Sequence, residues 1–152
     1  MTWIIDFVAY KYRESASVAA AAELYPLEIC VLHVDSCKQT MYYIMYPCDY
    51  FNNLTNKRLI HGHNLSWHDG DVTFYSALSS ILNAVGKDDL IFVPDAEKAD
   101  FFGKWFNNIH VLKNIPIVNS DYQNDVCERH NLLAYCAKIH CNALYRSLCS
   151  NR

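Results

Sequence analysis

The chain has 152 residues, a hydrophobic content of 52%, a charged content of 19% and a formal net charge of -3. This composition is typical of a globular protein with a solid core and excludes a disordered chain. The length suits one domain, so residues 1–152 are predicted to fold as a single unit. The mildly acidic balance excludes a global basic field for nucleic acid. Any RNA contact must therefore come from a local, salt-sensitive patch.

The cysteines and the apolar runs restrict where such a chain is expected to work. Seven cysteines without a recognisable secretory signal predict a reducing compartment, with cysteine used as core residue or metal ligand. Asp6 interrupts the apolar stretch at the N-terminus. No other run approaches the roughly 18 apolar residues of a membrane span, so no membrane partner is expected.

The first half of the chain is rich in β-forming residues. Three runs are predicted to be strands: residues 2–10, 28–34 and 40–46. The second and third are expected to be antiparallel neighbours, because residues 35–38 have turn chemistry. The Ala-rich stretch 15–24 predicts either a short helix stopped by Pro26 or a plain loop, since propensity alone is a weak guide.

The second half alternates helical and strand patterns. Asp71 is the predicted N-cap of a helix whose apolar residues recur at helical spacing until Gly86, and Asp95 is the predicted cap of the next helix. The other predicted elements are strands at 90–93 and 115–118 and a last helix at 130–148. The order β-β-β-α-β-α-β-α predicts an α/β fold with a mixed sheet flanked by helices, and other α/β sandwiches also satisfy it.

Near the C-terminus the sequence brings soft and borderline metal ligands together. Cys127, His130 and Cys136 are residue types that zinc favours. On one continuous helix His130 and Cys136 would lie about 9 Å apart along the axis. We therefore expect Cys127 and His130 in the turn before the helix, with Cys136 reaching back from its second turn. A fourth ligand is available from Glu28, at the mouth of a strand, or from His140, four residues after Cys136.

The remaining cysteines have a plainer interpretation. An isolated cysteine is usually a small buried hydrophobic residue. We interpret five of them in this way: Cys30, Cys37, Cys48, Cys141 and Cys149.

Two of these segments resemble the Maelstrom domain family. Residues 26–31, Pro-Leu-Glu-Ile-Cys-Val, are similar to the Pro-x-Glu-Ile-Gly-Cys-Val element of that family. Cys127, His130 and the pair Cys136-Ala137 resemble its Cys-x2-His followed by Cys-Ala, with a tighter gap between the histidine and the second cysteine. The Gly-His-Asn tripeptide at 62–64 is similar as well. The resemblance extends from about residue 3 to residue 148, without the high-mobility-group box that some members carry.

The resemblance implies a ribonuclease H-like fold related to DEDD exonucleases. It implies that Glu28, Cys127, His130 and Cys136 hold one zinc ion. It also implies a role in the piRNA pathway and transposon repression, in nucleus and cytoplasm. Single-stranded RNA and RNA-silencing proteins are the partners it implies.

The same resemblance predicts that the chain lacks some of the acidic residues that an active exonuclease needs. Two-metal phosphoryl chemistry needs several carboxylates around hard cations. The first strand keeps Asp6, but Val8 occupies the position of the second acid, and Cys136 stands where the last helix of the family fold carries an acid. We therefore predict no standard exonuclease activity. The resemblance leaves open a weak endonuclease action on single-stranded RNA that does not use the zinc ligands.

Two other functions remain open from the residues themselves. A mildly acidic, aromatic-rich chain also suits a non-catalytic protein–protein interaction module. A further His-rich segment carries His61, His63, His68, Asp69 and Asp71. Histidine with aspartate can perform acid–base chemistry, which would make the chain a nuclease with unusual active-site residues. The plainer interpretation of this segment is a polar loop that leads into a helix.

Overall fold

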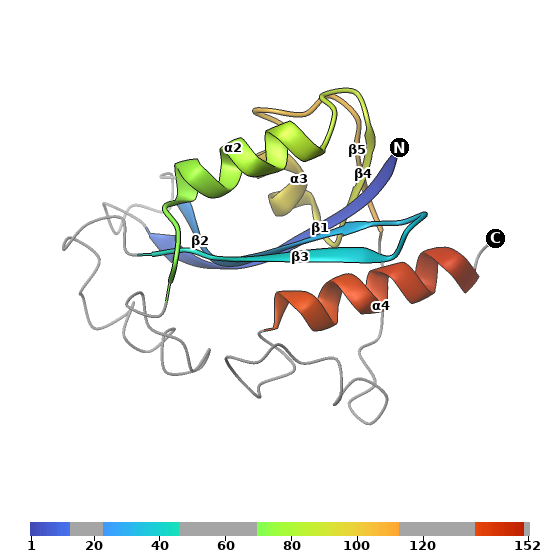
Figure 1. Cartoon of the computed structure of the whole chain (residues 1–152), viewed down its shortest axis with the longest axis horizontal. Coiled ribbons are helices and arrows are strands. Elements are labelled where there is room, and N and C mark those ends of the chain that lie inside the picture. Colours follow the sequence, from blue (N-terminus) through green and yellow to red (C-terminus); the bar gives the residue numbers. More distant parts are fainter. Residues whose placement is uncertain (13–22, 46–69, 113–135, 151–152) are drawn as a thin grey trace.

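The computed structural model describes residues 1–12, 23–45, 70–112 and 136–150. These residues form a five-stranded sheet in the order β3-β2-β1-β4-β5, with helix α2 over one face and helix α4 over the other (Figure 1). The predicted α/β fold with a mixed sheet flanked by helices is confirmed.

The strands are β1 (Thr2–Tyr12), β2 (Glu23–His33), β3 (Lys38–Tyr43), β4 (Leu90–Val93) and β5 (Ile109–Val111). The helices are α2 (Phe74–Ala84), α3 (Ala96–Phe102) and α4 (Ala137–Ser150). Strand β2 runs antiparallel to both of its neighbours, whereas β4 and β5 run parallel to β1. The mixed sheet thus has an antiparallel half and a parallel half.

Strand β2 begins earlier than the sequence predicts. It starts at Glu23, so Leu24 belongs to a strand and not to a helix, and Pro26 lies inside the strand. The pairing register shifts between Val8 and Ala9 of β1, where Ala9 faces Pro26. A bulge accommodates a proline because the ladder is already interrupted there. The rest of the Ala-rich stretch lies outside the described residues.

Two other boundaries also differ from expectation. Thr73 and not Asp71 caps α2, because its Oγ1 accepts the backbone N–H of Ser76 at 3.1 Å. The N–H of Asp71 instead donates to the carbonyl of Tyr43 at 2.9 Å and continues the sheet hydrogen bonding. The cap that the sequence places at Asp95 is confirmed, with its Oδ1 accepting the N–H of Lys98 at 2.9 Å.

Two predicted elements fall partly or wholly outside the part of the chain that the structure describes. Residues 115–118, the predicted last strand, lie there, and β5 is formed instead by Ile109–Val111. Helix α4 begins at Ala137, and the preceding part of the predicted 130–148 helix, residues 130–135, is not among the described residues.

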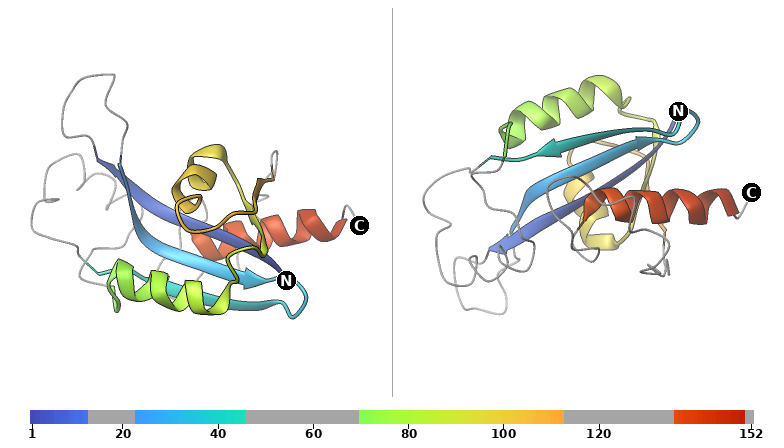
Figure 2. Two further views of the ribbon diagram at one scale, coloured as in Figure 1. Left: turned by 90° about the horizontal axis from the view of Figure 1, so that it is seen from above. Right: turned by 60° about the horizontal axis from the view of Figure 1, so that its bottom comes forward.

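The two faces of the sheet bury different sets of side chains because side chains alternate along each strand. The face under α2 and α3 carries an apolar core that includes Ile5, Phe7, Ile29, Val31, Ile81 and Phe102. The face under α4 carries a second core with Ile4, Cys30, Leu32, Ala137, Cys141 and Leu144. Figure 2 shows α4 lying along its own face of the sheet.

Gly70→Ala is expected to destabilise the fold. A Cβ at residue 70 would lie 2.3 Å from backbone atoms of Ile44 and Met45. The N–H of Met45 donates to the carbonyl of Val72 at 2.7 Å, so the two segments cannot separate without losing this bond. We expect a loss of about 1–3 kcal/mol in the free energy of unfolding, as for other overpacked sites. Urea denaturation measures it.

Gly86→Ala is the matched control for this substitution. A Cβ at residue 86 would meet only the carboxylate of Asp89, at 3.1 Å, so a shift of a few tenths of an ångström relieves the contact. Asp89 accepts the N–H groups of Trp3 and Gly86, which limits larger movement, and we expect a loss smaller than that of Gly70→Ala. Equal losses in the two variants would contradict the assignment of Gly70 to a required close approach.

Candidate functional site

Two acidic side chains interrupt the apolar face of the sheet beneath α4. Asp6 on β1 and Glu28 on β2 each have an exposed fraction of 0%. Their strand partners are Cys30 and Val8 respectively, which places both carboxylates on the α4 side of the sheet. A buried carboxylate is costly unless hydrogen bonds or cations compensate it. What each of them contacts therefore indicates its role.

Glu28 joins β2 to the beginning of α4. Its Oε1 accepts the backbone N–H of Ala137, the first residue of α4, at 2.6 Å. The first N–H groups of a helix have no partner within the helix, and the N-terminus of a helix favours negative charge. The sheet thus supplies a capping carboxylate to a helix that starts 109 residues later in the chain.

The predicted zinc ligands are brought together in part. Cys136 lies directly before Ala137 and is fully buried, so Glu28 and Cys136 approach the same helix end. Cys127 and His130 lie outside the described residues. The expectation that Cys136 occupies the second turn of the helix is wrong, because α4 begins only at Ala137.

The chemistry of these two residues fits a zinc site. Carboxylate and thiol are both zinc ligands. A carboxylate offers about four lone-pair positions, so the hydrogen bond to Ala137 is compatible with metal binding by Glu28. The residues that the structure describes contain no group of three or more His, Cys, Asp or Glu placed to hold a metal ion. The predicted set would be completed by Cys127 and His130.

Asp6 is the centre of a second cluster. It forms an ion pair with Lys98 of α3 through Oδ1, and its Oδ2 lies 3.0 Å from Nδ1 of His140 on α4. The backbone N–H of Phe7 also donates to Oδ1, at 2.7 Å. Burial favours the neutral acid, but the charge of Lys98 and the hydrogen bond from His140 outweigh it and hold the pKa of Asp6 below its ordinary value. Asp6 is therefore an ionised carboxylate that links three elements.

His140 presents its two ring nitrogens to different surroundings. Because Asp6 is ionised, Nδ1 is the donor in the contact between them. Nε2 is buried and has no hydrogen-bond partner among the described residues. A carboxylate that fixes an imidazole in this way is the usual support of a metal-binding or acid–base histidine. His140 thus stays the alternative to Glu28 as the fourth zinc ligand.

Lys98 is the residue of this cluster that sequence reasoning missed. A signal exists, because Lys98 lies four residues before the fully buried Phe102 and hence on the inner side of α3. A lysine at such a position requires a counter-charge. Nothing in the sequence indicates that Asp6, 92 residues away, supplies it.

The other cysteines divide into two groups. Cys30 and Cys141 are fully buried beneath α4, as predicted, and burial raises the pKa of the Cys141 thiol well above its usual range. Cys37 and Cys149 are exposed, so their interpretation as buried residues is wrong. Cys37 lies in the β2–β3 turn with φ 55°, and its thiol contacts the hydroxyl of Tyr145 at 2.7 Å. A turn directs its side chain toward solvent. Cys48 lies outside the described residues.

The His-rich segment is almost entirely outside the part of the chain that the structure describes. His61, His63, His68 and Asp69 are all outside it, and Asp71 is exposed. Its predicted acid–base role therefore stays a prediction.

Comparison with known proteins adds no family. No protein-family model matches the chain, and a search of curated proteins finds no similar sequence. Among the described residues, no helix is long and apolar enough to cross a membrane. The functional inference therefore depends on the residues around Glu28 and Asp6.

Proposed function

We propose that the chain is a Maelstrom-like domain with a ribonuclease H-like fold, stabilised by zinc, that binds single-stranded RNA in RNA silencing. The observation that carries this proposal is the hydrogen bond from Ala137 to Glu28. It joins the two segments on which the resemblance rests, although they are 109 residues apart. A zinc site shared by these two segments requires them to meet, and this hydrogen bond brings them together.

The arrangement of the sheet also supports the proposal. The described elements follow the order β1-β2-β3-α2-β4-α3-β5-α4, which is the order expected for a ribonuclease H-like domain. Asp6 lies in the middle of the first strand, where the related exonucleases carry a catalytic acid. The fold proposed here thus keeps the scaffold of a nuclease around a modified centre.

The proposed zinc ligands are Glu28, Cys127, His130 and Cys136. Zinc, when bound, would connect β2 to the start of α4 and add its binding free energy to folding. Glu28 supplies the negative charge and the cap of α4, and Cys136, the buried residue directly before α4, would supply a thiolate. Both are fixed by elements of the fold, which suits a structural ion better than an exchangeable catalytic one.

The centre around Asp6 disfavours magnesium-dependent exonuclease chemistry. Asp6 is already bonded to Lys98 and His140, and the residue two positions later on the same face is Val8. The acid that faces Val8 across the strands is Glu28, which is engaged with α4. Hard divalent cations need several converging oxygen ligands. The ammonium group of Lys98 is paired with Asp6, at the place where a metal cation would have to bind this carboxylate.

The remaining parts of the proposal follow from the resemblance alone. They are transposon repression in the piRNA pathway, RNA-silencing proteins as partners, and location in nucleus and cytoplasm. A protein–protein interaction module is the competing function, and RNA binding separates the two.

Metal content and RNA binding together test the proposal. Protein purified without added zinc is expected to contain close to one zinc per chain. It is also expected to bind fluorescently labelled single-stranded RNA with an affinity that falls as salt rises from 50 to 300 mM. Elemental analysis and fluorescence anisotropy measure these quantities. Zinc without RNA binding would favour the interaction module. Folded protein with neither zinc nor RNA binding would overturn the proposal.

Exonuclease assays are expected to be negative. End-labelled single-stranded RNA and DNA should keep their full length during incubation with the protein and magnesium or manganese, because the required carboxylates are missing or engaged. Denaturing gels measure the length. Asp6→Asn is the control: stepwise shortening by the wild-type protein that disappears in this variant would show that Asp6 does serve as a catalytic acid.

A further inference from the structure

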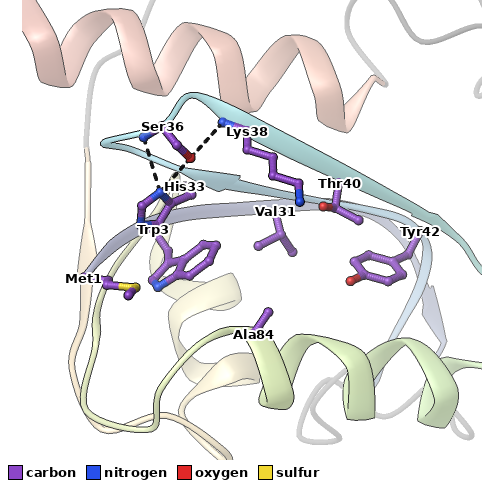
Figure 3. A pocket seen from close by; sticks show the side chains of 9 residues that line it. All are labelled: Met1, Trp3, Val31, His33, Ser36, Lys38, Thr40, Tyr42 and Ala84. Atoms are coloured by element: carbon purple, nitrogen blue, oxygen red, sulfur yellow. Dashed lines mark hydrogen bonds between the residues drawn. The ribbon is translucent and has the colours of Figure 1, made fainter.

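A cavity of about 290 Å³ lies on the opposite face of the sheet, between the strands and the last residue of α2 (Figure 3). Its position follows from the strand register. His33 of β2 faces Trp3 on one side and Lys38 on the other, and Val31 faces Thr40. Side chains that face each other across strands share one side of the sheet. The volume is near the lower end for ligand pockets, about 300–1,000 Å³, which suits one small ligand unit.

An aromatic side chain lies at each end of the cavity. Figure 3 shows the Trp3 ring at one end, Tyr42 at the other, and Val31 between them. Two contacts hold the Trp3 ring in place. Its indole N–H donates to Oδ2 of Asp89 at 2.9 Å, and the ring packs edge-on against the His33 ring, with the two ring centroids 4.6 Å apart. A fixed indole face beside an open cavity is a stacking surface for a planar heterocycle.

Polar groups line the same space. The side chain of Lys38 extends over the cavity toward Thr40, and the hydroxyl of Tyr42 points into it (Figure 3). Partial burial raises the pKa of Tyr42, so this hydroxyl remains a hydrogen-bond donor at neutral pH. An ammonium and a phenolic hydroxyl near one end of a cavity favour an anionic group there, and phosphate is bound by lysine as a point charge.

His33 lies at the aromatic end of the cavity. Its Nδ1 accepts the backbone N–H of Ser36 at 3.3 Å and lies 2.8 Å from the hydroxyl oxygen of Ser36, and these two contacts fix the ring against the β2–β3 turn. Nε2 is buried and lacks a hydrogen-bond partner among the described residues. Because this atom is buried, His33 serves the cavity by holding the Trp3 ring and not as a donor to a ligand.

We propose that this cavity binds one nucleotide, with the base stacked on Trp3 and the phosphate near Lys38 and the hydroxyl of Tyr42. A purely apolar ligand would make no use of the lysine ammonium and the tyrosine hydroxyl. An inorganic anion would leave the aromatic end empty. A nucleotide satisfies both ends with one planar ring and one phosphate.

The nucleotide has two sources, a free nucleotide or one residue of a single-stranded RNA. The second rests on the RNA binding proposed above, whereas the first is independent of it. Neither involves the zinc ligands, because the cavity is on the α2 side of the sheet and Glu28 is on the α4 side.

Titration followed by NMR tests the proposal. The indole N–H signal of Trp3 is assigned by its absence in Trp3→Phe, and the protein is titrated with UMP, with AMP, and with eight-residue oligo(U) and oligo(A). We expect the Trp3 signal to move with at least one mononucleotide or with an oligonucleotide. Lys38→Gln should weaken that binding at least fivefold. For an oligonucleotide it should also reduce the slope of log K against log salt by about 0.7.

Two further variants make the test specific. Ala84→Leu places a larger side chain in the cavity from α2 without removing any of the proposed contacts, and it should also weaken binding at least fivefold. Lys104→Gln removes the same charge from another exposed lysine, just after α3 and outside the cavity lining, and should bind as the wild-type protein does.

The outcomes separate this inference from the proposed function. Mononucleotide binding assigns a free-nucleotide site even if RNA binding and zinc fail. A response to the oligonucleotides alone assigns the site to RNA. The inference is overturned if no ligand moves the Trp3 signal, or if Lys38→Gln and Ala84→Leu bind as tightly as Lys104→Gln. RNA binding in that last case would leave the proposed function standing and place the RNA elsewhere.

Discussion

Asp6→Ala should lower the free energy of unfolding by about 3–5 kcal/mol, the range found when one partner of a buried ion pair is removed. The substitution leaves the side chains of Lys98 and His140, with exposed fractions of 17% and 20%, facing an apolar space without their carboxylate. Urea denaturation measures the loss. Asp100→Ala is the matched control: it removes an exposed aspartate from α3, and we expect a change within about 0.5 kcal/mol.

A double-mutant cycle identifies the partner that causes this loss. Asp6→Asn and Lys98→Met remove one charge each, and the double variant removes both. If the ion pair is responsible, the double variant should be more stable than the sum of the single losses predicts. Strictly additive losses would contradict the role of the pair and assign the effect of Asp6 to packing or to His140 alone.

Lowering the pH should remove the stabilisation that ionised Asp6 gives the wild-type protein. The pKa of Asp6 is lower in the folded state than in the unfolded chain, because Lys98 and His140 outweigh the effect of burial. The unfolded protein therefore takes up this proton first as the pH falls. The stabilisation is complete above about pH 4, the ordinary aspartate value, and is lost as the pH falls below it through the folded pKa. The stability difference between wild type and Asp6→Asn should therefore narrow as the pH falls below about 4.

The elements that the sequence predicts well are those with strong local signals. The strand at 90–93 is a short apolar run, and Asp95 caps the helix that follows it by a bond to Lys98 within one turn. Strand β5 has no such signal. It is three residues long and exists because Ile109–Val111 pairs in parallel with β4. The early start of β2 likewise depends on its long pairing with β1, which the local effect of Pro26 does not reveal.

The candidate site also has a part that is predicted from the sequence and a part that is not. Glu28 lies at the beginning of α4, next to the Cys136 segment, as a zinc site shared by these residues would require. The cluster around Asp6 could not be predicted, because Lys98 and His140 come from helices 92 and 134 residues away in the chain. Residue type restricts such contacts only weakly, since most lysines and histidines are solvated. Three-dimensional packing decides which of them meets the buried acid.

The last prediction concerns the residue that completes the zinc site. Glu28→Gln should abolish zinc retention while keeping much of the stability, because the amide oxygen can still accept the N–H of Ala137 but lacks the charge of a metal ligand. Glu28→Ala should lose zinc and also leave this N–H buried without its acceptor, at a further cost of about 1–3 kcal/mol. Zinc per chain after gel filtration is the deciding measurement, with urea denaturation beside it.

His140→Asn is the control that separates the two candidate ligands. An asparagine amide can still donate to Asp6 from the position of Nδ1, but it removes Nε2, the nitrogen that a zinc ion would use. If Glu28 is the ligand, His140→Asn should keep its zinc. If His140→Asn loses zinc while Glu28→Gln keeps it, the ion is held by the imidazole that Asp6 orients. Glu28 would then serve only as the cap of α4, and Asp6 would be the residue that supports the metal site.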